Sequence, residues 1–117
     1  MYDLIIKNGY VISGNRQRRC DIGVRGDKIA AVRKRLRPKA KDVIDARGKY
    51  VLPGVIDPHV HFGLSAYRAT TMDDFRSGSR AAACGGVTTA IDYAIPEGKE
   101  TPWQAVQRRI KEARGEA

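Results

Sequence analysis

The first fifty residues consist of short apolar runs separated by turn-forming residues. The turn sequences are Asn8-Gly9, Gly14-Asn15, Arg25-Gly26-Asp27 and Arg47-Gly48-Lys49. Pairs such as Asn-Gly between two apolar runs are typical of β-hairpins. The pattern predicts about five short strands, arranged as a small antiparallel sheet or as half of a β-sandwich.

The pattern changes near residue 50. Residues 50–57 read YVLPGVID, a nearly unbroken apolar run that is typical of a strand covered on both faces. A second, β-branched strand is predicted over residues 87–94. We therefore expect a β-rich domain at residues 1–50 and an α/β domain at residues 51–117.

A helix is predicted between these two strands. It is expected to begin at Thr70 or Thr71, whose hydroxyl would accept the first free amide hydrogens, and to end at Gly85-Gly86. Asp73 and Asp74 suit the positive end of such a helix.

A second helix is predicted over residues 101–117, after the second strand. Thr101 is its expected N-cap and Pro102 its first residue. Spacings of three and four place an apolar set on one face, namely Trp103, Val106 and Ile110. The order strand, helix, strand, helix predicts the start of a parallel α/β arrangement.

Basic residues are concentrated in the first half of the chain. The whole chain carries 22 Lys and Arg against 13 Asp and Glu, for a net charge of +9. Residues 1–50 hold 14 basic and 5 acidic residues, whereas residues 51–117 hold 8 of each. The basic run at residues 32–41 has no interleaved aromatic residues that could stack on bases. A solvated surface is therefore favoured over a nucleic-acid partner, which stays the minor alternative.

The two cysteines and the apolar runs bear on the compartment. Cys20 and Cys84 do not form a C-x-x-C motif, so we expect reduced, packed thiols, with Cys84 buried near a helix end. No apolar run is long enough to span a bilayer, and the N-terminus lacks the layout of a signal peptide. A cytoplasmic protein with no membrane partner is predicted.

The chain has two histidines, and both follow the predicted apolar strand. They lie in LPGVIDPHVHFG, residues 52–63. Residues two apart in an extended chain point the same way, so Asp57, His59 and His61 are expected on one side of the strand end, where active groups gather in parallel α/β folds. Imidazole is a common zinc ligand, and a nearby carboxylate could orient it. Two histidines so spaced also occur by chance, but this context favours a metal site.

The wording around the histidines resembles a known family. VLPGVIDPHVHF resembles the first metal motif of the amidohydrolase superfamily, and the likeness extends over essentially all 117 residues. Within the superfamily the chain is most similar to dihydropyrimidinases and hydantoinases. Dihydroorotases and allantoinases fit less well. Dihydroorotases usually have an arginine where this chain has Phe62-Gly63, and a Met-Pro-Asn type sequence where it has Asp92-Tyr93-Ala94.

The resemblance implies both a fold and a chemistry. The fold would be a partial β-sandwich followed by the first two β/α units of a metal-dependent (β/α)8 (TIM) barrel. Two divalent ions, usually zinc, would be bound in the complete enzyme, with His59 and His61 as ligands of the more buried ion. A hydroxide between the ions would hydrolyse the ring C–N bond of a cyclic amide. A full-length member would be a homo-oligomer, a tetramer.

Three further residues are candidates for the same site. Leu64 and Tyr67 lie in the loop that corresponds, in hydantoinases, to a loop shaping the pocket for the substrate's side group. Their presence would also be explained if they only pack the loop itself. Asp92 ends the second strand, where it could face the site or make structural hydrogen bonds.

Several residues of the family's site have no counterpart in this chain. The bridging lysine, two further histidines and the proton-transfer aspartate would fall beyond Ala117. A complete barrel needs roughly 250 residues, and a working zinc site normally has three or more protein ligands. We therefore expect an N-terminal fragment that is inactive on its own. A non-catalytic, dihydropyrimidinase-related assembly protein is the alternative, and the two retained histidines disfavour it.

Overall fold

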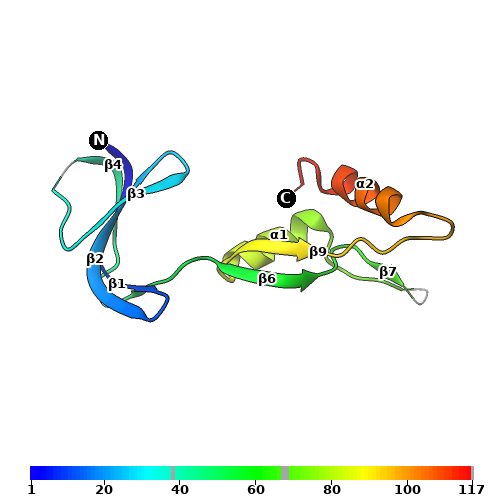
Figure 1. Cartoon of the computed structure of the whole chain (residues 1–117), viewed down its shortest axis with the longest axis horizontal. Helices are drawn as coiled ribbons and strands as arrows, with labels where there is room; N and C mark the ends of the chain where they lie inside the picture. The colour runs from blue at the N-terminus through cyan, green and yellow to red at the C-terminus, as the bar shows by residue number, and fades with distance from the viewer. Residues whose placement is uncertain (38, 67–68, 117) are drawn as a thin grey trace. The chain divides into compact units, whose positions relative to one another are not determined.

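The computed structural model describes residues 1–37, 39–66 and 69–116 (Figure 1). The chain forms two compact units, Met1–Pro53 and Gly54–Ala117. The division lies after Pro53 rather than at residue 50, because β5 (Tyr50–Val51) pairs in parallel with β1 (Tyr2–Ser13) of the first unit. The prediction of one strand over residues 50–57 is therefore wrong. That stretch is divided between β5 and β6 (Val55–Val60), which belong to different units.

The first unit is a single sheet of mixed direction. The strands other than β1 and β5 are β2 (Arg16–Arg25), β3 (Lys28–Arg33) and β4 (Ala40–Asp45). Tight turns join β1 to β2 at Gly14-Asn15 and β2 to β3 at Gly26-Asp27, as predicted, and the strands of each pair are antiparallel. Of the two predicted arrangements, the small antiparallel sheet is wrong, since β4 and β5 lie parallel to β1. The strand order is β3-β2-β1-β4, so the link after β3 carries the chain past β2 to the far side of β1. There β4 runs parallel to β1.

The Asn8-Gly9 pair forms a β-bulge and not the predicted hairpin turn. β1 continues through it, and its register with β2 shifts between Ile6 and Gly9. Asn8 has a φ of 64°, a left-handed conformation that asparagine tolerates better than most residues. Its backbone N–H donates to Asp21 at 3.0 Å and its side-chain amide donates to Asp45 at 2.8 Å. The residue that favours a turn therefore also stabilises a bulge.

The second unit alternates strands and helices. Besides β6 it contains β7 (Ser65–Ala66), β8 (Ala69–Thr70), α1 (Phe75–Cys84), β9 (Val87–Asp92) and α2 (Pro102–Ala113). β6 and β9 pair in parallel, and α1 lies between them in the chain and alongside them in space (Figure 1). The predicted strand–helix–strand–helix order is confirmed. The short hairpin of β7 and β8 was not predicted, because strands of two residues carry no readable alternation.

Helix α1 begins later than predicted, with Asp74 as its N-cap. The Asp74 carboxylate accepts a hydrogen bond from the Ser77 backbone N–H at 2.8 Å, and the Ser77 hydroxyl accepts one from the Asp74 N–H at 3.1 Å. These two bonds form a capping box, and the hydrogen bond from the Ser77 N–H to the carboxylate holds the pKa of Asp74 below its usual value. Neither Thr70 nor Thr71 is the cap, since Thr70 belongs to β8 and the Thr71 hydroxyl accepts from the Leu64 N–H.

The two cysteines differ in burial. Cys20 is packed in the sheet of the first unit, as expected. Cys84 is exposed, so the prediction that it is buried is wrong. The buried residue of α1 is Gly78, and Cys84 lies at the last position of the helix, just before the predicted stop at Gly85. Position near a glycine stop therefore does not indicate burial here.

Helix α2 begins as predicted, but its apolar face is exposed. Thr101 is the N-cap, Pro102 is the first residue, and Gln104 completes a capping box. The predicted face of Trp103, Val106 and Ile110 is open to solvent in the described residues, with Trp103 69% exposed. The buried residue of α2 is Ala105. Neither helix of the described residues has the length and apolar character needed to cross a bilayer.

Replacing Thr101 with alanine is expected to destabilise the second unit by about 1 kcal/mol, because the Gln104 N–H loses its side-chain acceptor. Urea unfolding followed by the circular dichroism of the helices would measure this change. Thr101→Ser is the matched control, since it keeps the hydroxyl and should stay near the unaltered chain. An equal loss in both variants would contradict the capping role.

Candidate functional site

His59 and His61 lie at the carboxyl end of β6, and their rings meet edge-on, with an angle of 69° between the planes. The two Nε2 atoms are 3.0 Å apart, and the ring centroids are 5.0 Å apart. His59 is exposed and His61 is half-buried. Depending on the tautomers, one Nε2–H donates to the other Nε2. The two imidazoles therefore present one pair of nitrogen atoms to a common point.

Asp57 supports the backbone of this segment. Its carboxylate accepts a hydrogen bond from the His59 backbone N–H at 3.1 Å, so this bond holds the main chain of His59 and not its imidazole. The register between β6 and β9 is irregular from Asp57 to Val60, and Pro58, which has no N–H to donate, lies inside that stretch. The hydrogen bond to Asp57 thus stabilises the end of β6, where the pairing with β9 is incomplete.

Tyr93 is a neighbour of the histidines that the sequence analysis did not single out. Its ring stacks on His59, with centroids 4.2 Å apart and an angle of 17° between the planes. The Tyr93 backbone N–H donates to the Val60 carbonyl at 3.1 Å, which fixes the ring beside the pair. The signal in the sequence was its position directly after β9. Parallel strands end at the same edge, so residues that follow them meet.

The donor set of the two histidines fits a divalent cation such as zinc. Zinc–nitrogen bonds of about 2.0–2.1 Å in a tetrahedral arrangement place two ligand nitrogens about 3.3 Å apart. The observed separation of 3.0 Å between the Nε2 atoms is close to that value, so a small ring rotation would aim both lone pairs at one ion. Neutral imidazole is also a ligand type that zinc favours.

The described residues supply only part of a metal site. The Nδ1 atom of His61 is buried and has no hydrogen-bond partner among them, whereas metal-binding histidines usually donate this second nitrogen to an acceptor. Within residues 1–37, 39–66 and 69–116, no three side chains of His, Cys, Asp or Glu are grouped closely enough to hold an ion. Two imidazoles alone are fewer than the three ligands of a typical zinc centre.

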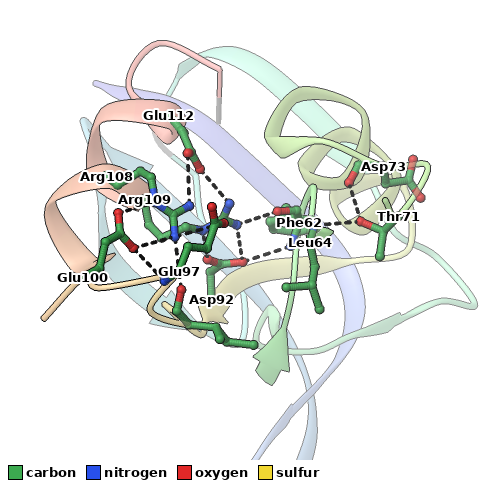
Figure 2. A network of polar contacts seen from close by, with 11 residues as sticks. Phe62, Leu64, Thr71, Asp73, Asp92, Glu97, Glu100, Arg108, Arg109 and Glu112 are labelled. Atoms are coloured by element: carbon green, nitrogen blue, oxygen red, sulfur yellow. Dashed lines mark hydrogen bonds and ion pairs between the residues drawn. The ribbon is translucent and has the colours of Figure 1, made fainter. Parts of the chain in front are cut away.

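A cavity of about 410 Å³ adjoins His61. This volume is in the range of sites for small molecules. Leu64, a predicted substrate contact, lines the cavity together with Tyr93. Two hydrogen bonds with Thr71 hold the Leu64 backbone, both at 2.9 Å (Figure 2). Tyr67, the other predicted contact, lies outside the described residues.

Asp92 makes the structural hydrogen bonds that were one of its two predicted roles. Its carboxylate forms a two-pronged ion pair with Arg109 of α2, with Oδ2 2.8 Å from Nε and Oδ1 2.9 Å from Nη2. Oδ1 also accepts from the Phe62 backbone N–H at 3.0 Å, and the same Arg109 Nη2 donates to the Phe62 carbonyl (Figure 2). The bond to Asp92 raises the pKa of Arg109, which stays charged.

A second arginine forms a cluster that shares Glu112 with the first. Arg108 pairs with Glu100 at 3.0 Å, Glu97 at 3.2 Å and Glu112 at 3.3 Å, and it donates to the Ile95 carbonyl (Figure 2). The bond to Glu100 raises the pKa of Arg108 above its ordinary value. This cluster ties α2 to the loop that precedes it. The sequence analysis found neither arginine, because it assigned the inward face of α2 to apolar residues.

Over most of its length the chain is similar to proteins named hydantoinase, allantoinase and dihydropyrimidinase. It is 38% identical over 113 residues to the D-hydantoinase of Geobacillus stearothermophilus, which covers 97% of this chain and 24% of that protein. It is 47% identical over 94 residues to the allantoinase of Salmonella choleraesuis, which covers 80% of this chain and 20% of that protein. The dihydropyrimidinase structure from Brevibacillus agri superposes with a TM-score of 0.91 at 35% identity, over 97% of this chain and 24% of the other.

These relatives are much longer than the chain, which spans about a quarter of their length or less. A match to a protein-family pattern supports the family assignment independently of these relatives. The pattern described as the Amidohydrolase family matches residues 42–106, which is more than half of the 117 residues and includes both histidines. The resemblance inferred from the histidine motif is confirmed, and the chain belongs to the amidohydrolase family.

Proposed function

We propose that this chain forms the N-terminal part of a metal-dependent hydrolase that opens cyclic amides of the hydantoin or dihydropyrimidine type. The observation that carries the proposal is the convergence of the His59 and His61 Nε2 atoms, 3.0 Å apart, with His61 lining a cavity of about 410 Å³. The relatives named hydantoinase and dihydropyrimidinase support the substrate class.

In this proposal each residue of the site has a limited task. His59 and His61 hold a divalent ion, and Tyr93 keeps the His59 ring in place by stacking on it. A bound ion of this kind acidifies water and polarises a carbonyl group. Leu64, together with Tyr67, contacts the substituent of the ring, since Leu64 lines the cavity. Asp57 holds the backbone of His59.

The remaining ligands are proposed to come from parts of the protein that correspond to the unmatched three quarters of the relatives. Three or more protein ligands are normal for zinc, and two are supplied here. The first unit is then part of a β-sandwich, and β6, α1, β9 and α2 are the first two β/α units of a (β/α)8 barrel. Their parallel pairing and their order support this assignment.

Two coarser features of the proposal concern the whole protein. We place the enzyme in the cytoplasm, where the exposed thiol of Cys84 would stay reduced. We also expect it to be a homo-oligomer, as the resemblance implies. The apolar face of α2, with Ile110 half exposed, is consistent with burial against further protein.

Allantoin is the second candidate substrate. The allantoinase relative has the higher identity, 47%, although over fewer residues than the hydantoinase. Both names describe enzymes for small cyclic amides, so the reaction class is the same and the ring substituent differs. Parallel assays with hydantoin, dihydrouracil and allantoin would rank the three substrates.

A chimera tests the proposed function directly. This chain replaces the matching segment of the Geobacillus stearothermophilus D-hydantoinase, and metal content and ring opening are measured. We expect hydrolysis that a chelator abolishes and that added Zn²⁺ or Co²⁺ restores. A folded, metal-loaded chimera without turnover on any of the three substrates would contradict the proposal, as would turnover that is independent of metal.

A further inference from the structure

The backbone of Phe62, the residue after His61, is held at both of its polar groups by one ion pair. Its N–H donates to Asp92 Oδ1 at 3.0 Å, and its carbonyl accepts from Arg109 Nη2. These two atoms of the pair are themselves 2.9 Å apart. Figure 2 shows that the Asp92 carboxylate and the Arg109 guanidinium converge on this single peptide segment.

These bonds continue the sheet past the point where the β6–β9 backbone pairing ends. Val60 is opposite Asp92 in the register, and the Val60 carbonyl accepts from the Tyr93 N–H at 3.1 Å. The Asp92 side chain then takes over from the strand and binds the Phe62 N–H. His61 therefore lies between two residues whose main chains are anchored to the end of β9.

Arginine is suited to this position because its planar guanidinium makes four hydrogen bonds to three partners. The guanidinium reaches Asp92 through Nε and Nη2, Phe62 through Nη2 and Glu112 through Nη1 at 2.7 Å. The Arg109 Cζ atom also lies 4.4 Å from the centre of the Phe75 ring. The Arg109 and Asp92 side chains are only 13% and 14% exposed. A lysine, with a single point charge, cannot reproduce this set of contacts.

The ring of Phe62 is confined as well. A Cβ atom at Gly78 would lie 2.4 Å from the Phe62 ring, so helix α1 approaches the ring as closely as glycine permits. Phe75 contacts the same ring edge-on, with centroids 5.7 Å apart. The side chain and the main chain of Phe62 are therefore both fixed, which leaves little freedom to the His61 backbone before it.

From this geometry we propose that Arg109, acting through Asp92 and Phe62, is a positioning residue for His61. It sets the direction of the His61 imidazole so that its Nε2 meets that of His59. The inference rests on the proposed function, because the pair is assumed to bind a metal ion. It adds a residue of α2, 48 positions from His61, to the support of that site.

Co²⁺ binding by the metal-free hydantoinase chimera, which supplies the remaining ligands, tests the inference, with absorption spectroscopy as the readout. Every variant is made in this chimera and compared with the chimera that carries the unaltered chain. The variants are Arg109→Met, Arg109→Lys and Asp92→Asn. Arg108→Met is the matched control, because Arg108 is the adjacent residue of α2 and pairs with the same Glu112, while its other hydrogen bonds go to Glu100 and the Ile95 carbonyl and not to Phe62. His61→Ala reports whether the observed Co²⁺ is bound at the histidine pair. Urea unfolding of every variant gives its stability separately.

We expect Arg109→Met to bind Co²⁺ about 10- to 100-fold more weakly and to change the cobalt spectrum, the range seen for groups that support metal ligands. Arg108→Met should bind within about twofold of the unaltered chain even where its stability falls. Arg109→Lys should not restore the affinity. In the metal-free chimera, Asp92→Asn should speed exchange of the Phe62 amide hydrogen by about tenfold, since the charged acceptor is lost.

The outcomes separate this inference from the proposed function. If His61→Ala binds Co²⁺ as tightly as the unaltered chain, the metal site itself is wrong, and the positioning role is wrong with it. If binding needs His61 but Arg109→Met and Asp92→Asn keep the affinity and the spectrum, only the positioning role is wrong. Equal weakening in Arg108→Met and Arg109→Met would also refute it, because the pair would then act only by stabilising α2. Should Arg109→Met not fold, Asp92→Asn, which keeps the side-chain shape, decides the same question.

Discussion

Replacing His61 with alanine in the hydantoinase chimera is expected to lower kcat/KM by at least about a thousandfold and to abolish retention of metal through dialysis. A bound ion lowers the pKa of water to about 7 and stabilises the transition state by several kcal/mol. About 4 kcal/mol corresponds to a thousandfold change in rate. His59→Ala should have a similar effect, because its Nε2 is the partner atom at 3.0 Å.

Asp57→Asn is the control for this prediction. The Asp57 carboxylate accepts from the His59 backbone N–H, and an asparagine amide oxygen can accept the same bond. Turnover and metal content should therefore stay within a few-fold of the unaltered chimera. Atomic absorption and initial rates on the same samples give both quantities. Full activity with unchanged metal content in His61→Ala would remove the basis for the metal assignment.

The site could be predicted from sequence to the extent that it depends on one strand end. His59 and His61 are two residues apart after an apolar run, and the two-residue period of a strand brings their rings to one side. The N-cap at Thr101 was predicted equally well, because the residues that form it lie within one turn. Local patterns of this kind need no knowledge of the fold.

Tyr93 and Arg109 could not be found in the same way. Tyr93 reaches His59 only because β9 pairs in parallel with β6, and Arg109 reaches Phe62 across 47 positions of sequence. The prediction that the apolar face of α2 is the buried one also hid Arg109. Ile110 is exposed, whereas the long, charged side chain of Arg109 faces inward. An arginine can do so because its charge is matched by Asp92 and Glu112.

The first unit shows a different limit of sequence patterns. Asn8-Gly9 has the composition of a hairpin turn, yet β1 continues through this pair and forms a bulge there. What selects the bulge is the Asp21 carboxylate, thirteen positions away, which accepts the Asn8 N–H. Local preference allowed either conformation, and a distant buried acceptor decided between them.

Asp21→Ala is accordingly expected to destabilise the first unit by about 2–4 kcal/mol. Asp21 is 4% exposed and lies between the buried residues Cys20 and Ile22 in β2. Its two oxygens accept from the backbone N–H groups of Asn8 at 3.0 Å and Leu36 at 2.8 Å. Alanine leaves both donors without an acceptor, and each buried unpaired donor costs about 1–3 kcal/mol.

Asn and surface variants make the prediction specific to the two hydrogen bonds. Asp21→Asn keeps one acceptor oxygen, so its loss of stability should be intermediate between those of the unaltered chain and Asp21→Ala. Asp42→Ala removes an exposed carboxylate from β4 and should change stability by less than about 0.5 kcal/mol. Urea unfolding gives these differences, and hydrogen exchange of the Asn8 and Leu36 amides locates them. If Asp21→Ala leaves both amides as protected as before, the carboxylate is not what holds the bulge, because its two donors must then have other acceptors.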